Sequence, residues 1–141
     1  MIKVLVFGTF DLIHPGHVDF LNQAKEYGDE LIVVVARDIT VKSVKKELPH
    51  NDENMRLKEV AKIKTVSKAL LGNTDDPYRI IESIKPDIIC LGYDQNHFAV
   101  DLAQVLKERN LSIRIVRLMP YKETEFKSSI IKNNNAKDDK L

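Results

Sequence analysis

The sequence has a single cysteine, no long apolar run and almost no net charge, and each of these absences excludes a class of protein. Cys90 alone cannot form a disulfide framework within the chain, and its place in the apolar run 88–91 indicates a buried thiol. The 22 basic and 21 acidic side chains nearly cancel, so no long-range field gathers nucleic acid or anionic membrane. No run could span a bilayer, and a strand-like pattern begins by Ile2, which leaves no room for a signal peptide. We therefore expect a cytoplasmic protein that binds neither nucleic acid nor membrane.

Two common phosphate-binding motifs are missing as well. The chain contains no Gly-x-Gly-x-x-Gly and no Gly-x-x-x-x-Gly-Lys, so neither a dinucleotide-dependent dehydrogenase nor a P-loop kinase is supported. Any phosphate that this chain handles must therefore be held by another local geometry.

What is present suffices for one domain with a hydrophobic core. The 141 residues are 43% hydrophobic. Apolar segments of strand length lie at residues 4–7, 31–36, 66–71, 88–91 and 113–118. Most are apolar on both faces, which is typical of parallel strands covered on two sides. Helical patterns alternate with them, at residues 18–26, 54–63, 77–84 and 99–110.

This order of elements predicts an α/β fold: a single Rossmann-like, doubly wound, parallel five-stranded sheet. We expect the domain to cover residues 1–132. Residues 133–141 have nothing to bury and are expected to form a disordered tail.

Polar residues follow four of the predicted strands. In an open α/β sheet, ligands bind outside the carboxyl ends of the strands, so these residues should share one edge. They are Gly8, Thr9, Asp11, His14 and His17 after the first strand, Arg37, Asp38 and Lys42 after the second, Gly92 and Asp94 after the fourth, and Tyr121 and Lys122 after the fifth.

The turn from the first strand into the first helix has the residues of a phosphate site. Pro15 suits the first position of a helix, and Gly16 lets a ligand approach the backbone closely. The free N–H groups and the dipole of a helix N-terminus attract phosphate. His14 and His17 add two imidazole donors, which near pH 7 can donate whether charged or neutral.

These histidines have two other interpretations. Each could be a helix cap or a satisfied core group, which is the better interpretation for a lone histidine but the weaker one for a His-Pro-Gly-His unit at such a turn. A metal site is the rival functional interpretation. It is weaker still, because His50 and His97 lie in separate loops and no further ligand stands at a recognised spacing. We predict no protein-built metal site.

Residues 8–17, which read GTFDLIHPGH, resemble the signature of the cytidylyltransferase-like superfamily, whose His-x-Gly-His motif binds a nucleoside triphosphate. Within it the chain resembles archaeal FAD synthases, through residues 35–38, 85–95 and 128–131. The resemblance implies an FMN adenylyltransferase, which transfers the AMP moiety of ATP to FMN and releases pyrophosphate. It also implies a divalent cation held mainly by phosphate oxygens. Homodimers are common among relatives, so a homodimer is a candidate assembly.

Matching positions imply particular roles. His14, His17 and Lys42 would be catalytic, and the nucleotide would be bound by Thr9, Phe10, His14, Pro15, Gly16, His17, Asp94, Tyr121, Ser128 and Ser129. Plain structural alternatives stay open for three of them. Lys42 could belong to a solvated face, Asp94 could start a turn, and Tyr121 could be a surface aromatic.

The chain departs from bacterial cytidylyltransferases in two places. Many of them have an aromatic residue at the position of Pro15, and an Arg-Thr-x-Gly-Ile-Ser-Thr-Thr segment where residues 121–129 keep the serines but lose the Arg-Thr start. CTP specificity is therefore not carried over. Arg56 could match the helix arginine that reaches the acceptor or the phosphates in relatives, or it could occupy an exposed helix position.

Other functions remain open at this stage. The same His-x-Gly-His site would serve a glycerol-3-phosphate cytidylyltransferase, a sugar-phosphate adenylyltransferase, or a non-catalytic nucleotide- or flavin-binding module. An electron-transfer flavoprotein of this size is a further alternative. In the favoured mechanism the acceptor phosphate is the nucleophile, so the chain needs alignment and charge neutralisation rather than a nucleophilic residue of its own.

Overall fold

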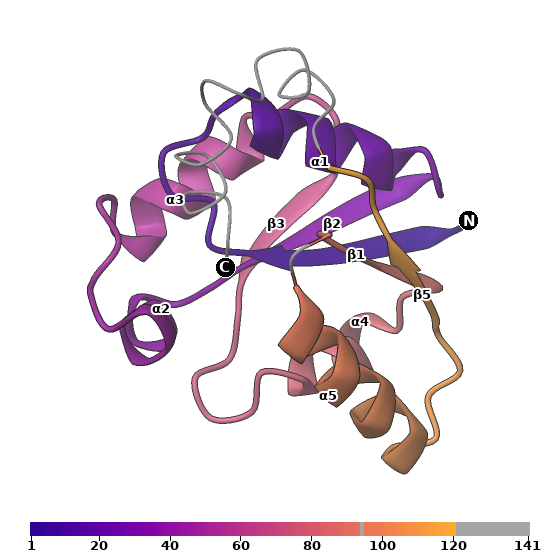
Figure 1. Cartoon of the computed structure of the whole chain (residues 1–141). Coiled ribbons are helices and arrows are strands. Elements are labelled where there is room, and N and C mark those ends of the chain that lie inside the picture. Colours follow the sequence, from indigo (N-terminus) through magenta and orange to yellow (C-terminus); the bar gives the residue numbers. More distant parts are fainter. Residues whose placement is uncertain (94, 121–141) are drawn as a thin grey trace.

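The computed structural model describes residues 1–93 and 95–120, with the backbone alone for residues 96–100. It contains one sheet with helices on both faces (Figure 1). The strands are β1 (Lys3–Gly8), β2 (Glu30–Val35), β3 (Lys68–Leu71), β4 (Ile88–Leu91) and β5 (Arg114–Arg117). The helices are α1 (Pro15–Lys25), α2 (Asp38–Lys45), α3 (Glu53–Ala61), α4 (Arg79–Ile84) and α5 (Asn96–Glu108).

All strand pairs are parallel, and the strand order is β3-β2-β1-β4-β5. The chain winds outward from β1 through β2 to β3, and then crosses back to place β4 on the other side of β1. The switch point of this doubly wound sheet therefore lies between β1 and β4. Ligands of such sheets bind at the carboxyl ends of the strands beside this point, and the turn from β1 to α1 starts there.

The core is divided by the sheet into two layers. Val4 and Val6 point into one layer, with Leu21 of α1 and Val60 of α3, whereas Leu5 points into the other. On that second side the sheet packs against Ile81 of α4 and against Leu102 and Leu106 of α5. In Figure 1, α1 and α3 accordingly cover one face and α4 and α5 the other. Because both faces are covered, the strands read as continuous apolar runs.

The predicted fold class is confirmed, and all five predicted strands are present, with ends that differ by no more than two residues. The prediction lacked α2, a helix of eight residues that buries only Val41. The loop assignment of His97 was wrong, because α5 begins at Asn96. The predicted domain end at residue 132 and the tail 133–141 lie outside the described residues.

The structure bears on the environment of Cys90 and on whether any described helix could span a membrane. Cys90 is fully buried in β4, and burial raises the pKa of its thiol to about 11, so an inert core cysteine is confirmed. Among residues 1–93 and 95–120, no helix has the length and apolar character needed to cross a bilayer.

Candidate active site

The turn after β1 adopts an uncommon backbone conformation. Phe10 and Leu12 have φ angles of 54° and 55°, in the left-handed region that costs a residue with a side chain about 1–2 kcal/mol. The ring of Phe10 folds back over Gly8, where an added Cβ would lie 2.5 Å from a ring carbon. Phe10 is 3% exposed, and its ring meets the ring of His17 edge-on at 5.6 Å between centroids. A buried aromatic residue thus shapes the turn and supports His17.

The two histidines cap the helix that follows. His14 is the N-cap residue of α1, and its Nδ1 accepts a hydrogen bond from the N–H of Gly16 at 3.0 Å. His17 reaches back, and its Nδ1 accepts from the backbone N–H of His14 at 3.2 Å. This reciprocal pair is a capping box built from imidazoles instead of hydroxyl and carboxylate groups. The rings stack with centroids 3.9 Å apart.

These bonds determine which nitrogen of each ring carries the proton. Because Nδ1 accepts in both rings, a neutral imidazole there bears its hydrogen on Nε2, the atom at the far side of the ring. Burial lowers the pKa of His17 to about 4, aided by the charges of His14 and Lys45 and opposed by Asp11. His17 is therefore neutral at pH 7, and for this ring donation in the neutral form is favoured over the charged alternative left open by the sequence.

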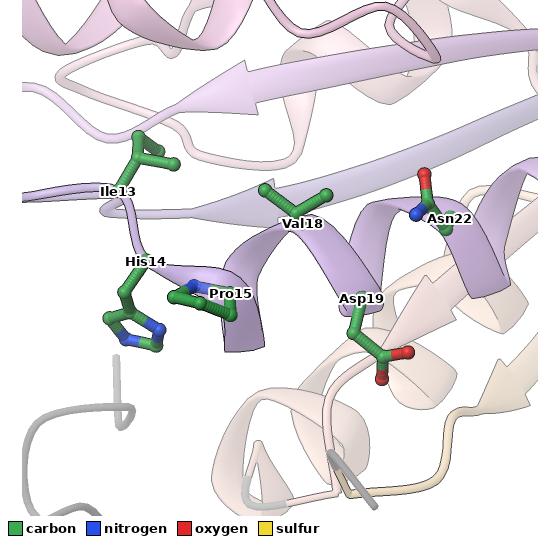
Figure 2. Close-up of a pocket in the computed structure, with 6 residues that line it drawn as sticks. All are labelled: Ile13, His14, Pro15, Val18, Asp19 and Asn22. Carbon is green, nitrogen blue, oxygen red and sulfur yellow. The ribbon is translucent and has the colours of Figure 1, made fainter. Parts of the chain in front are cut away.

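The start of α1 opens into a groove on the molecular surface. Figure 2 shows the six described residues that line it, all from the turn and from α1: Ile13, His14, Pro15, Val18, Asp19 and Asn22. The groove has a volume of about 570 Å³ and is open to solvent. It therefore offers room for a ligand or a chain segment that runs from the histidines along α1.

Asp11 links the turn between β1 and α1 to the segment before α3. Its carboxylate accepts hydrogen bonds from the backbone N–H groups of His50 at 2.6 Å and Asn51 at 2.9 Å. The segment before α3 is thereby tied to the histidine turn. Within the part of the chain that the structure describes, no three His, Cys, Asp or Glu side chains gather in a way that could hold a metal ion.

Arg56 of α3 is buried and donates a hydrogen bond to the turn between β1 and α1. Its side chain is 0% exposed, so the exposed helix position considered from the sequence was wrong. The guanidinium donates from Nη1 to the carbonyl oxygen of Thr9 at 2.8 Å, from Nε to the carbonyl oxygen of Asn51 at 3.0 Å, and from Nη2 to the carboxylate of Asp38 at 2.7 Å. Each of its three donor nitrogens thus has a protein acceptor, so Arg56 supports the site from within the fold.

Glu53, one turn before Arg56 on α3, extends this arrangement. Its Oε2 accepts from Arg37 at 3.1 Å, and its Oε1 accepts from the backbone N–H of Asp38 at 2.9 Å. Arg37 in turn donates to the carbonyl oxygen of Gly72 at 2.8 Å. The chain segments that leave β1, β2 and β3 are therefore joined by one polar network anchored on α3.

Two lysines of α2 bear on the candidate site. Lys42 stays the predicted catalytic lysine, and it lies exposed in the last turn of the helix. Lys45 is exposed in the same turn, and its charge contributes to the lowered pKa of His17. Sequence reasoning did not single out Lys45.

A separate set of bonds shapes the turn after β4, across the switch point. The backbone N–H of Gly92 donates to Oε1 of Gln95 at 2.6 Å, and Arg117 of β5 donates to the carbonyl oxygens of Gly92 and Tyr93 at 3.3 and 3.2 Å. Gln95 is only 8% exposed. Sequence reasoning missed both Gln95 and Arg117. The predicted nucleotide contact Asp94, which directly precedes Gln95 in the sequence, lies outside the described residues.

Comparison with known proteins agrees with this geometry. A family model described as cytidylyltransferase-like matches residues 5–134, nearly the whole chain. The chain belongs to this cytidylyltransferase-like family. The predicted family is thus confirmed, and the match includes the histidine turn, the α3 network and the turn after β4.

Members of the cytidylyltransferase-like family that resemble this chain include archaeal enzymes. A protein named FAD synthase from Archaeoglobus profundus is 46% identical over 129 residues, which cover 92% of this chain and 82% of the relative. One of the same name from Thermoplasma acidophilum is 43% identical over 132 residues, covering 94% and 92%. Among solved structures, a lipopolysaccharide core biosynthesis protein from Thermoplasma volcanium has a TM-score of 0.81 and 40% identity, covering 86% of this chain and 98% of that one.

In this cytidylyltransferase-like chain, the structure brings one group of the predicted nucleotide contacts together. Thr9, Phe10, His14, Pro15, Gly16 and His17 share the turn from β1 to α1. The ring of Phe10 is buried beneath His17, so its backbone is the part that faces the turn. The predicted contacts that lie outside the described residues are Asp94, Tyr121, Ser128 and Ser129.

Proposed function

We propose that this chain is an FAD synthase, which transfers the AMP moiety of ATP to FMN and releases pyrophosphate. The observation that carries the proposal is the pair of imidazole donors on the N-terminus of α1, at the carboxyl end of β1 and beside the switch point of the sheet. The relatives named FAD synthase, at 46% and 43% identity over most of both chains, support FMN as the acceptor.

In the proposed reaction a phosphate oxygen of FMN attacks the α-phosphorus of ATP. The bond between that phosphorus and the oxygen bridging to the β-phosphate breaks, and its electron pair leaves with pyrophosphate. The new bond joins the two monophosphates of FAD. A phosphate monoester with a second pKa near 6 is already largely deprotonated at pH 7, so the step needs no general base from the protein, which suits a site whose imidazoles are held as donors.

The chain would contribute alignment and stabilisation of negative charge. We infer that the Nε2–H groups of His14 and His17 donate to oxygens of the triphosphate, whose charge grows on the transferred group and on the leaving pyrophosphate. The positive end of the α1 dipole lies at the same place, although the N–H groups of Gly16 and His17 are bonded within the turn. Lys45, and Lys42 by the sequence-based assignment, would supply positive charge from α2.

A divalent cation fits this site only as a partner of the nucleotide. Among the described residues Asp11 is the nearest carboxylate of the turn, and its oxygens already accept two backbone N–H groups. We propose that the cation binds mainly through phosphate oxygens, where it neutralises charge on the triphosphate.

The test is to incubate the purified chain with FMN, a divalent metal salt and either ATP or CTP, and to separate the flavins by chromatography. FAD and an equal amount of pyrophosphate should form with ATP. A His17→Gln protein, which keeps a side chain able to cap the helix, serves as the matched inactive control. Failure of the wild-type protein to form FAD under any of these conditions overturns the proposed acceptor. Tight nucleotide binding without pyrophosphate release would instead indicate a binding module.

A further inference from the structure

Arg37 lies just beyond the carboxyl end of β2, beside the turn that carries the histidines. The last pair of the β1–β2 ladder joins Gly8 to Val35, and the N–H of Ala36 donates to the carbonyl oxygen of Gly8 at 2.9 Å. Arg37 follows Ala36, just as Thr9 follows Gly8. Because neighbouring strands lie about 4.8 Å apart, the backbone at Arg37 borders the start of the turn from β1 to α1.

Two acceptors fix the guanidinium of Arg37. Its Nε donates to the carbonyl oxygen of Gly72, beyond β3, at 2.8 Å, and its Nη1 donates to the carboxylate of Glu53 on α3 at 3.1 Å. No described residue accepts a hydrogen bond from Nη2, which carries two N–H groups. The side chain is 36% exposed, so a ligand can reach it from solvent. Arg37 is thus an oriented cation with donors that the described part of the fold does not use.

Arg56, the other arginine of this polar network, has no such capacity. It is fully buried, and each of its three nitrogens already donates to a protein oxygen. The ion pair between Arg37 and Glu53 is instead partly exposed, at 36% and 23% of the two side chains. Ion pairs open to solvent contribute little to the stability of a fold. Folding stability alone therefore does not account for an arginine at position 37.

The place of Arg37 in the sheet indicates which substrate it would meet. Under the proposed function the triphosphate binds at the histidines, beside the switch point between β1 and β4. Strand β2 lies on the opposite side of β1 from β4. In an in-line displacement the attacking oxygen approaches the phosphorus opposite to the leaving group, so the acceptor needs a side that pyrophosphate does not occupy. The carboxyl end of β2, where Arg37 stands, offers such a side.

We propose that Arg37 binds the phosphate group of the acceptor, with Nη2 donating to an oxygen other than the one that attacks. FMN as the acceptor rests on the proposed function, and Arg37 makes the site specific for a phosphomonoester over the same flavin without its phosphate. The planar guanidinium suits phosphate oxygens better than an ammonium does. Glu53 and the carbonyl of Gly72 hold it in place, which lowers the entropy lost when the acceptor binds.

Arg37→Gln tests this role by equilibrium binding, without turnover. FMN and riboflavin, the same flavin without the phosphate, are titrated separately against the protein with a magnesium salt and α,β-methylene-ATP, a nucleotide that cannot release pyrophosphate. We expect the wild-type protein to bind FMN at least about tenfold more tightly than riboflavin. Arg37→Gln should raise the Kd for FMN about ten- to hundredfold, the factor of one hydrogen bond to a charged group, and leave the Kd for riboflavin within about twofold.

Arg79→Gln is the matched control, because it removes the same charge and an exposed ion pair, with Asp75, at the start of α4. Its dissociation constants for both flavins should equal those of the wild-type protein. The Kd for ATP should be unchanged in Arg37→Gln, since Arg37 is assigned to the acceptor. If Arg37→Gln does not fold, Arg37→Lys replaces it: an ammonium paired with Glu53 has no second nitrogen to offer, so the preference for FMN should still fall by at least about threefold.

Four results would overturn the role of Arg37. The first is a wild-type protein that binds FMN no better than riboflavin, and the second is a preference for FMN that survives in the variant. The third is equal weakening of both flavins, which indicates a purely structural arginine. The fourth is weaker binding of ATP, which would place the guanidinium on the triphosphate. If the wild-type protein makes no FAD but its preference for FMN depends on Arg37, the proposed reaction fails while the phosphate site stands.

Discussion

Arg56 donates a hydrogen bond to the carbonyl oxygen of Thr9 at 2.8 Å, and this bond joins the buried face of α3 to the turn that carries both histidines. The same guanidinium binds Asp38 at the start of α2. One fully buried side chain therefore sets the relative positions of the imidazole donors and of the helix with the lysines.

Arg56→Met should lower the free energy of unfolding by about 3 kcal/mol, because it leaves the Thr9 carbonyl and the Asp38 carboxylate without their donor. Urea unfolding measures the change. Arg79→Met is the control, since its ion pair with Asp75 is exposed on both sides and should contribute less than about 1 kcal/mol. Equal losses in the two variants would contradict the structural role of Arg56.

His14→Asn should keep the fold and lose most of the turnover. Asparagine is among the best N-cap residues, and its side-chain oxygen replaces the Nδ1 acceptor for Gly16, but it offers no donor at the position of Nε2. Loss of one such donor typically lowers kcat by about 10²–10³. Thermal unfolding and FAD formation are measured on the same preparation. Turnover within threefold of the wild-type value would show that the Nε2–H group is dispensable.

Lys45→Ala should reduce turnover more than Lys42→Ala. Both lysines are exposed in the last turn of α2, but the charge of Lys45 contributes to the lowered pKa of His17. We expect at least a tenfold loss of kcat/KM for ATP in Lys45→Ala, about 1.4 kcal/mol of transition-state stabilisation, and a smaller loss in Lys42→Ala. The reverse order would restore the original assignment of Lys42.

Stability should fall on acidification because of His17. Its pKa is lowered from 6.5 to about 4 in the folded chain, chiefly by burial, so between these values the unfolded chain binds more protons. The free energy of unfolding therefore rises as the pH rises through this window. The contribution of His17 to stability is lost as the pH falls from 6.5 toward 4. From pH 7.5 to pH 5 the loss due to His17 is up to about 2 kcal/mol.

Urea unfolding of the wild-type and His17→Gln proteins at both pH values isolates this contribution. The variant has no imidazole at that position, so its stability should change less between pH 7.5 and pH 5. An identical pH dependence in the two proteins would rule out a depressed pKa for His17.

The sequence was sufficient for the strands and for the histidine turn because both depend on short-range patterns. A strand buried on two faces must be a continuous apolar run, as at Ile88–Leu91. The unit from His14 to His17 contains its own N-cap, its own Pro15 at the first helical position, and its own donors. The fold class and the position of the histidine turn at the start of α1 could thus be predicted without knowledge of the rest of the chain.

The remaining features depend on partners distant in sequence. An arginine on a helix is exposed in most proteins, and nothing around Arg56 indicates that its acceptors come from Thr9 and Asp38. Gln23 likewise finds its partner, Met119, only after the sheet has formed. Helix α2 was missed because it is only eight residues long, about two turns, and buries a single residue, Val41.

The reciprocal bonds between His14 and His17 also place a limit on how this fold can become more heat-resistant. Serine, asparagine and aspartate are the residues that start helices best, yet any of them at residue 14 would remove a donor that the proposed chemistry uses. Selection for thermal stability and selection for catalytic turnover therefore oppose each other at this position. Homologues from hotter environments should keep the imidazole pair and obtain their stability elsewhere, for example in the exposed faces of α3 and α5.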